Sequence, residues 1–259
     1  MNLKREFSSR GYIIVDLTRD SKVTNEFNPQ NIINDIAIKI KSNDAKLNPK
    51  FYHYNEFPRI IEGWKFSASI KALALNSFIL RILETLYNRE PIAFSTINFV
   101  KGSEQPFHSD YFHFGSMPEL MLAGVWVALE DIDPMAGGLA LVPGSNNLPI
   151  VMPEDLGITY KPKSTPEIKQ IYTRYESYVE KLIREDNLCI EIPALRKGQA
   201  IIWDANLLHG GAPILNYELT RYSQVTHYHF KGCQYFYNPI FSSRSLYTRR
   251  DITNSIIEP

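Results

Sequence analysis

Four segments in the middle and second half of the chain have the hydrophobic pattern of strands. Residues 120–129 and 200–204 are almost continuously apolar, and residues 96–100 are rich in β-branched and aromatic side chains. Residues 221–230 alternate between polar and apolar positions. Short apolar runs are typical of strands buried on both faces, and strict alternation is typical of a strand with one buried face. The pattern therefore predicts a mainly β core.

Two other segments have a helical pattern. Residues 67–87 and 166–185 carry apolar side chains at spacings of three and four, which predicts one helix in each segment, packed on the core through one face. The second helix belongs to an insertion at about 150–187, between a predicted turn at 143–145 and a predicted strand at about 188–192. In a β-barrel enzyme an insertion at this place would lie at the rim. Two alternatives stay open for it, a lid over the substrate or a buttress outside the barrel.

Length and composition predict one domain over residues 1–259. The chain has 259 residues, of which 44% are hydrophobic, and all-β domains of this length are common. Its 28 basic and 28 acidic residues balance. A nucleic-acid-binding protein or a protein of anionic membrane surfaces would need a basic patch, so both classes are disfavoured. No oligomeric state follows from the sequence.

The cysteines and the N-terminus predict a cytoplasmic protein. Only Cys189 and Cys233 are present, far apart and without the spacing of a zinc site or a disulfide scaffold, so both are expected to be reduced. The first residues lack the apolar segment of a signal peptide, and no apolar run is long enough to span a bilayer.

The candidate chemistry lies in three short motifs. His108 and Asp110 are two residues apart, His209 follows 99 residues after Asp110, and Arg221 follows 12 residues after His209. Side chains at positions i and i+2 of a strand share a face, so His108 and Asp110 would point together into a barrel. Two histidines and one carboxylate form the facial triad of non-haem Fe(II) enzymes. The sequence therefore predicts an iron site.

Four segments resemble the phytanoyl-CoA dioxygenase-like (PhyH) family of Fe(II)- and 2-oxoglutarate-dependent oxygenases. They are residues 7–15, the metal motif at 105–110, and the central blocks 124–131 and 137–145. The resemblance implies a double-stranded β-helix, a jelly-roll or cupin-like barrel with flanking helices. It also implies Fe(II), 2-oxoglutarate and O₂ as cofactor and co-substrates of a dioxygenase that hydroxylates a small molecule.

The same resemblance implies roles for individual residues. The implied set comprises the metal ligands His108, Asp110 and His209 and, around 2-oxoglutarate, Arg221, Gln105, Trp126 and Ser223. Arg221 would pair with the C5 carboxylate, as a guanidinium suits bidentate carboxylate binding. At position 211 related enzymes often carry a serine, whereas this chain has Gly211. The co-substrate contact of that hydroxyl is therefore expected to be missing.

Two other functions remain as alternatives. A cupin-type metal enzyme would use the same barrel and a divalent metal without 2-oxoglutarate, and a non-catalytic relative would keep the fold as a binding module. Arg221 argues against the first, since a site without a dicarboxylate has no need of it. The intact triad argues against the second.

The remaining histidines are predicted to be structural. His113 should lie on the strand face opposite Asp110, and His227 and His229 should be satisfied or partly exposed on their strand, about 20 Å beyond Arg221 by strand rise. His53 is also assigned a structural role. Trp203 is predicted to be an ordinary core residue.

Overall fold

The computed structural model describes residues 3–19, 27–42, 59–159, 162 and 164–237. The helices are α1 Leu3–Arg10, α2 Pro29–Lys41, α3 Ala68–Ala74, α4 Ser77–Tyr87 and α5 Thr165–Glu185. The strands are β1 Tyr12–Asp16, β2 Arg59–Ile61, β3 Pro91–Phe99, β4 Phe114–Met117, β5 Leu122–Ala128, β6 Leu139–Leu141, β7 Gln199–Asp204, β8 His209–Gly211, β9 Ser223–Phe230 and β10 Gln234–Tyr237. His53 lies outside the described residues.

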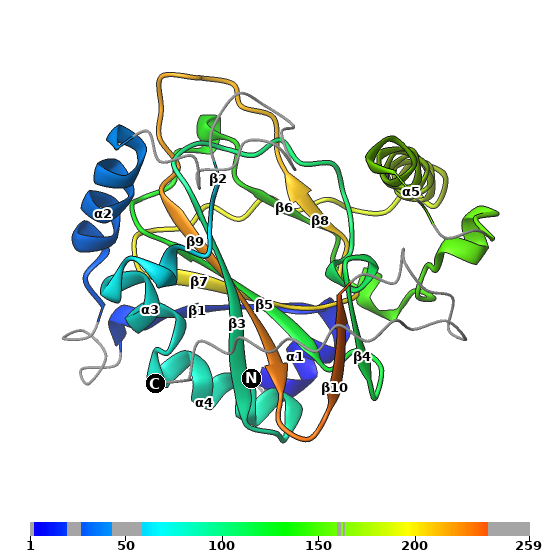
Figure 1. The fold of residues 1–259 in the computed structure, drawn as a ribbon, viewed down its shortest axis with the longest axis horizontal. Helices are drawn as coiled ribbons and strands as arrows, with labels where there is room; N and C mark the ends of the chain where they lie inside the picture. Colours follow the sequence, from blue (N-terminus) through cyan, green and yellow to red (C-terminus); the bar gives the residue numbers. More distant parts are fainter. Residues whose placement is uncertain (1–2, 20–26, 43–58, 160–161, 163, 238–259) are drawn as a thin grey trace.

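A six-stranded antiparallel sheet forms the centre of the molecule (Figure 1). Its strand order is β1-β7-β5-β9-β3-β2, so the strands predicted at 96–100, 120–129, 200–204 and 221–230 are neighbours in one sheet. Two short antiparallel pairs, β6–β8 and β4–β10, complete the strands of the described region.

The two faces of the large sheet pack differently. Alternate residues of a strand point to opposite faces, so on β7 Ala200 and Ile202 join the cluster shared with helices α1 to α4, whereas Ile201 and Trp203 point the other way. The second face carries a smaller cluster that also includes Trp126 and Val225. Helices α1 to α4 therefore pack on one face of the large sheet, and Ile201 and Trp203 project from the other face.

The segment predicted as one helix at 67–87 forms two helices. Helix α3 ends at Ala74, and the side chain of Asn76 accepts hydrogen bonds from the backbone N–H groups of Phe78 and Ile79 at the start of α4. A side-chain cap of this kind starts a new helix because it satisfies N–H groups that the preceding turn cannot. The prediction of a single helix was wrong because apolar spacing alone does not detect such a break.

Helix α5 lies away from the other four helices (Figure 1). It packs through Ile171, Tyr175 and Val179 against a separate apolar cluster that includes Phe112 and Leu208.

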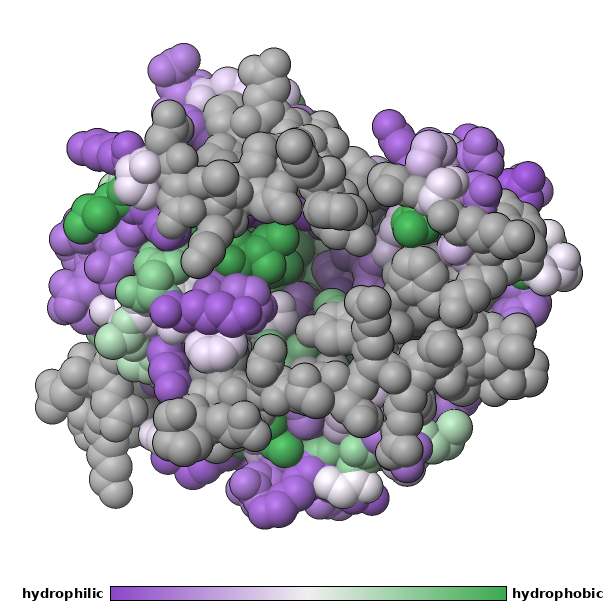
Figure 2. Space-filling view, viewed as in Figure 1, coloured by the Kyte–Doolittle hydropathy of each residue, from purple (hydrophilic) through white to green (hydrophobic). Residues whose placement is uncertain are grey.

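Polar residues dominate the rim of the face seen in Figure 2, and many of the visible apolar residues lie nearer its middle. No helix in the described part of the chain is both long and apolar enough to cross a membrane.

Candidate metal centre

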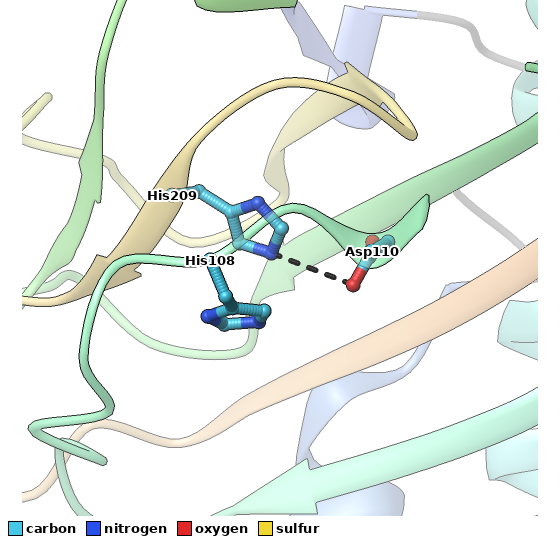
Figure 3. A group of neighbouring side chains, drawn as sticks. All are labelled: His108, Asp110 and His209. Carbon is cyan, nitrogen blue, oxygen red and sulfur yellow. Dashed lines mark ion pairs between the residues drawn. The ribbon is translucent and has the colours of Figure 1, made fainter. Parts of the chain in front are cut away.

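His108, Asp110 and His209 come together between the large sheet and the short strands (Figure 3). His209 is the first residue of β8, and its backbone N–H and C=O both pair with those of His108, each at 2.9 Å. Asp110 starts a 3-10 helix that runs to Phe112. The prediction that His108 and Asp110 share one strand was therefore wrong, because the chain leaves the bridge at His108 and turns.

The three side chains have the geometry of a metal-binding group. One ligand atom of each lies within 4.8 Å of the others, and all three residues are buried. His108 Nδ1 lies 2.8 Å from the carbonyl of Pro106, and His209 Nδ1 lies 2.9 Å from that of Leu207. A carbonyl can only accept, so each Nδ1 carries the proton and each Nε2 keeps its lone pair. These orienting bonds fit metal-ligating histidines.

The charges at the group also fit a cation. Burial alone would raise the pKa of Asp110, but His209 and His227 beside it hold this pKa well below its ordinary value. Burial lowers the pKa of His108 well below its ordinary value, and His209 and His113 lower it further. The donor set is two imidazoles and one carboxylate, the combination that Fe(II) takes in facial triads.

Two residues predicted from the sequence to be structural, Trp203 and His227, contact Asp110. The indole N–H of Trp203 donates to Asp110 Oδ2 at 2.7 Å, and His227 Nε2 lies 3.5 Å from the same oxygen. His227 and His229 are buried, and three of their four ring nitrogens have no hydrogen-bond partner among the described residues. The expectation that both are satisfied or partly exposed was wrong. Distance from Arg221 was a poor criterion, because His227 lies beside Asp110 and not beside Arg221.

Gln105 and His113 flank His108. Gln105 Nε2 lies 3.1 Å from His108 Nε2, and Gln105 Oε1 accepts from Arg59 at 3.0 Å. The ring of His113 lies 5.1 Å from that of His108, and its Nδ1 lies 3.2 Å from the hydroxyl of Tyr172. The predicted opposite-face position of His113 was wrong, since the 3-10 turn replaces the strand. Burial lowers the pKa of His113 to about 4.

Helix α5 contacts the segment that carries Asp110. The hydroxyl of Tyr175 accepts from the backbone N–H of Ser109 at 2.8 Å and donates to its side-chain oxygen at 3.2 Å. The rings of Tyr175 and Phe112 stack 3.6 Å apart, with 4° between their planes. Of the two alternatives for the helical insertion, these buried contacts favour the buttress.

Arg221 occupies a second polar position, immediately before β9. It is 2% exposed, and its guanidinium donates to the carbonyl of Gly137 at 3.0 Å. The guanidinium carbon lies 5.2 Å from the ring centre of Phe99 and 5.7 Å from that of Trp126. Burial, together with Arg59, lowers the pKa of Arg221 to about 9, and no described carboxylate offsets this effect.

Two buried donors at this position have no acceptor in the described structure, Nε of Arg221 and Nε1 of Trp126. Because a buried cation without a counterion is costly, a bound carboxylate would satisfy what the protein leaves open. The residues present therefore fit an anionic co-substrate such as 2-oxoglutarate.

Two further positions were predicted to bear on the co-substrate, Ser223 as a contact and Gly211 as a missing contact. Ser223 is fully buried, and its hydroxyl donates to the carbonyl of Arg221 at 3.3 Å. A Cβ at Gly211 would lie 2.5 Å from the backbone nitrogen of Glu104 and 2.6 Å from the hydroxyl oxygen of Ser103. This crowding explains why position 211 has no serine, since the side chain would have no room.

Comparison with known proteins gives a consistent result. The family model for phytanoyl-CoA dioxygenase (PhyH) matches residues 70–221. The peroxisomal phytanoyl-CoA dioxygenase of Rattus norvegicus is 22% identical over 170 residues, which cover 66% of this chain and 43% of the rat protein. The chain thus spans less than half the length of that relative.

Solved structures share the fold over nearly the whole chain. The non-heme alpha-ketoglutarate-dependent epimerase SnoN from nogalamycin biosynthesis has a TM-score of 0.65 at 18% identity, with 98% of this chain and 90% of that chain covered. EctD from S. alaskensis with bound Fe has a TM-score of 0.60 at 18% identity, covering 98% and 84%. The expected cupin-like β fold with flanking helices is confirmed. The chain belongs to the phytanoyl-CoA dioxygenase family.

Proposed function

We propose that this protein is an Fe(II)- and 2-oxoglutarate-dependent dioxygenase that hydroxylates a small molecule. The observation that carries the proposal is the pairing of two incomplete sites in one fold. His108, Asp110 and His209 form a buried group that suits a divalent metal, and Arg221 is a buried cation that lacks a carboxylate among the described residues. Fe(II) completes the first site and a dicarboxylate completes the second.

Each residue then has a defined task. His108 and His209 offer Nε2 and Asp110 offers a carboxylate oxygen to the metal, while Arg221 holds the C5 carboxylate of 2-oxoglutarate beside Trp126. Iron, 2-oxoglutarate and O₂ together supply the oxidising power. Coordination by His108 requires its contact with Gln105 to break, because one lone pair cannot serve both. This release frees the Gln105 amide for the co-substrate.

The balanced charge of the chain favours neither nucleic acid nor an anionic membrane surface as a partner. Cys189 and Cys233 are both free thiols, which fits the reducing environment of a cytoplasmic protein. Because one solved structure of this fold is an epimerase, a substrate screen should read out changes of configuration as well as oxygen insertion.

Asp110 favours oxygen insertion over halogenation. Related iron halogenases carry a small residue in place of the carboxylate ligand, and the vacated position accepts halide. Here Asp110 fills that position. Mass spectrometry of products formed in chloride buffer should show a gain of oxygen, and a chlorinated product would contradict the assignment of Asp110.

Succinate release tests the proposed function. Protein reconstituted anaerobically with Fe(II) is exposed to O₂ and 2-oxoglutarate, alone and with a panel of small molecules. We expect succinate in amounts that rise with a true substrate, and none from His209→Ala. Oxygen consumption without any succinate from folded, iron-loaded protein would favour the cupin-type alternative.

A further inference from the structure

Three residues form one row across the large sheet beside the candidate metal centre. Gly124 of β5 pairs with Trp203 of β7 on one side and with His227 of β9 on the other. Residues paired in this way project from the same face of the sheet. The rings of Trp203 and His227 meet above the row at 90°, with their centres 6.4 Å apart.

Gly124 is the residue that lets Trp203 lie across the sheet. A Cβ built on Gly124 would lie 2.7 Å from Nε1 of Trp203 and closer still to two carbons of its ring. Both residues are in the buried interior, where the ring cannot move aside without displacing neighbours. Glycine in this strand therefore marks a close approach of a side chain to the backbone.

The two oxygens of Asp110 have different surroundings. Oδ1 lies 3.7 Å from Nε2 of His209, on the side where the ligand atoms converge. Oδ2 receives the indole N–H of Trp203 at 2.7 Å and faces Nε2 of His227 at 3.5 Å. Oδ1 thus faces the other metal ligands, and Oδ2 contacts Trp203 and His227 of the row.

We propose that Trp203, seated over Gly124, is a positioning residue that keeps Asp110 a one-oxygen metal ligand, with His227 as a second support. This inference rests on the proposed function. Three protein ligands and a two-point co-substrate leave one position of an octahedral metal for O₂. A second bond from Asp110 would fill that position. Holding Oδ2 away from the metal therefore preserves the site of O₂ binding.

Trp203→Phe tests this role, with Trp64→Phe as its matched control. Trp64 also donates its indole N–H to a carboxylate, that of Glu62 at 2.6 Å, and both of those residues lie outside the metal-binding group. Co(II) serves as the probe, measured by calorimetry for affinity and by visible absorption for coordination. We expect roughly tenfold weaker Co(II) binding and an altered spectrum in Trp203→Phe. Trp64→Phe should match wild type in both.

Gly124→Ala tests the same hydrogen bond in a second way, because it keeps the indole of Trp203 but adds a methyl group where the ring lies. We expect the same loss of affinity and the same spectral change. In the double variant with Trp203→Phe the two losses should not add, since both act through one hydrogen bond. If only one of the single variants folds, as judged by circular dichroism, that variant decides the test.

Wild-type Co(II) affinity and an unchanged spectrum in a folded variant would overturn the inference. Failure of the proposed function would look different, because wild-type protein itself would then not bind Co(II), or His209→Ala would bind it equally well. A fall in thermal stability with unchanged Co(II) binding would assign Trp203 a purely structural role and would also overturn the inference.

Discussion

The metal-binding group and the Arg221 position differ in how many of their polar groups have hydrogen-bond partners within the described protein. At the metal-binding group each histidine is oriented by a backbone carbonyl, and Asp110 accepts the indole N–H of Trp203. At the Arg221 position, Nε of Arg221 and Nε1 of Trp126 have no acceptor among the described residues. The first region has its orienting bonds in place within the protein, whereas the second would be satisfied by a bound anion.

The difference teaches how binding energy is distributed between the two regions. Preoriented ligands lose little freedom on binding a metal, so affinity there depends on keeping each ligand and its support. At Arg221 a buried charge has no compensating carboxylate among the described residues. Removal of the arginine should therefore weaken binding of an anionic ligand without destabilising the ligand-free protein. Variants at the two regions should therefore behave differently.

The largest effect is expected from His209→Ala, which removes one of the three proposed metal ligands. Fe(II) or Co(II) binding, measured by calorimetry, should become undetectable or fall by several orders of magnitude. His229→Phe is the matched control, because His229 is equally buried but contacts Phe94 and Tyr235 rather than the metal-binding group. Equal metal binding in wild type and His209→Ala would remove the site as described.

The next largest effect is expected from Arg221→Met. Affinity for 2-oxoglutarate should fall by at least about a hundredfold, since losing one partner of a buried ion pair costs roughly 3 to 5 kcal/mol. Metal affinity should stay near wild type. The melting temperature of the ligand-free variant should equal or exceed that of wild type, because the uncompensated charge is gone.

Arg221→Lys sharpens this comparison between the two regions. Lysine keeps the charge but loses the planar pair of donors, so its affinity for 2-oxoglutarate should lie between those of wild type and Arg221→Met. Unchanged 2-oxoglutarate affinity in Arg221→Met would place the co-substrate elsewhere.

A smaller effect is expected from Tyr175→Phe on α5. The variant leaves the buried N–H of Ser109 without its acceptor, which costs about 1 to 3 kcal/mol, or roughly 3 to 9 °C in melting temperature. Metal affinity should fall too, because Ser109 precedes Asp110. Tyr178→Phe on the exposed side of the same helix is the control, and equal behaviour of the two variants would refute the buttress role.

The smallest effect concerns Asp204, which lies outside both regions. Burial raises its pKa to about 6 from 3.8, although hydrogen bonds from Asn206 and Tyr87 oppose the rise. The folded state therefore binds more protons than the unfolded state between about pH 4 and 6, and stability falls as pH rises through this window.

Asp204→Asn should remove this dependence on pH. The variant should gain on the order of 1 to 2 kcal/mol at pH 7 and nothing at pH 4, as measured by urea unfolding at both values. An identical pH profile in wild type and variant would show that Asp204 has an ordinary pKa in the folded protein.

The sequence predicted the strands well because their apolar pattern reflects burial in a sheet. It also nominated His108, Asp110 and His209, which the fold brings together. It misplaced the first two on a strand, since a three-residue 3-10 turn has no distinct hydrophobic period. The motif spacing was therefore a better guide than the local structure assumed for it.

The supports of the site were harder to predict than its ligands. Trp203 and His227 reach Asp110 only because three strands place them in one row around Gly124, and such pairing is not visible in a single sequence. A glycine inside the apolar run at 120–129 was the one available signal, since glycine in a strand often marks a close approach. Tyr175 reaches Ser109 across 66 residues, with no local signal.

The most direct test of the two-region site is a calorimetric titration of 2-oxoglutarate into the wild-type protein, with and without bound Fe(II) under anaerobic conditions. In the proposed site the metal would supply two contacts to 2-oxoglutarate and Arg221 would supply the third, so both should be needed for tight binding. We predict one 2-oxoglutarate per chain, bound far more tightly with Fe(II) than without it. Equal binding in both states, or no binding to the iron-loaded protein, would contradict the account.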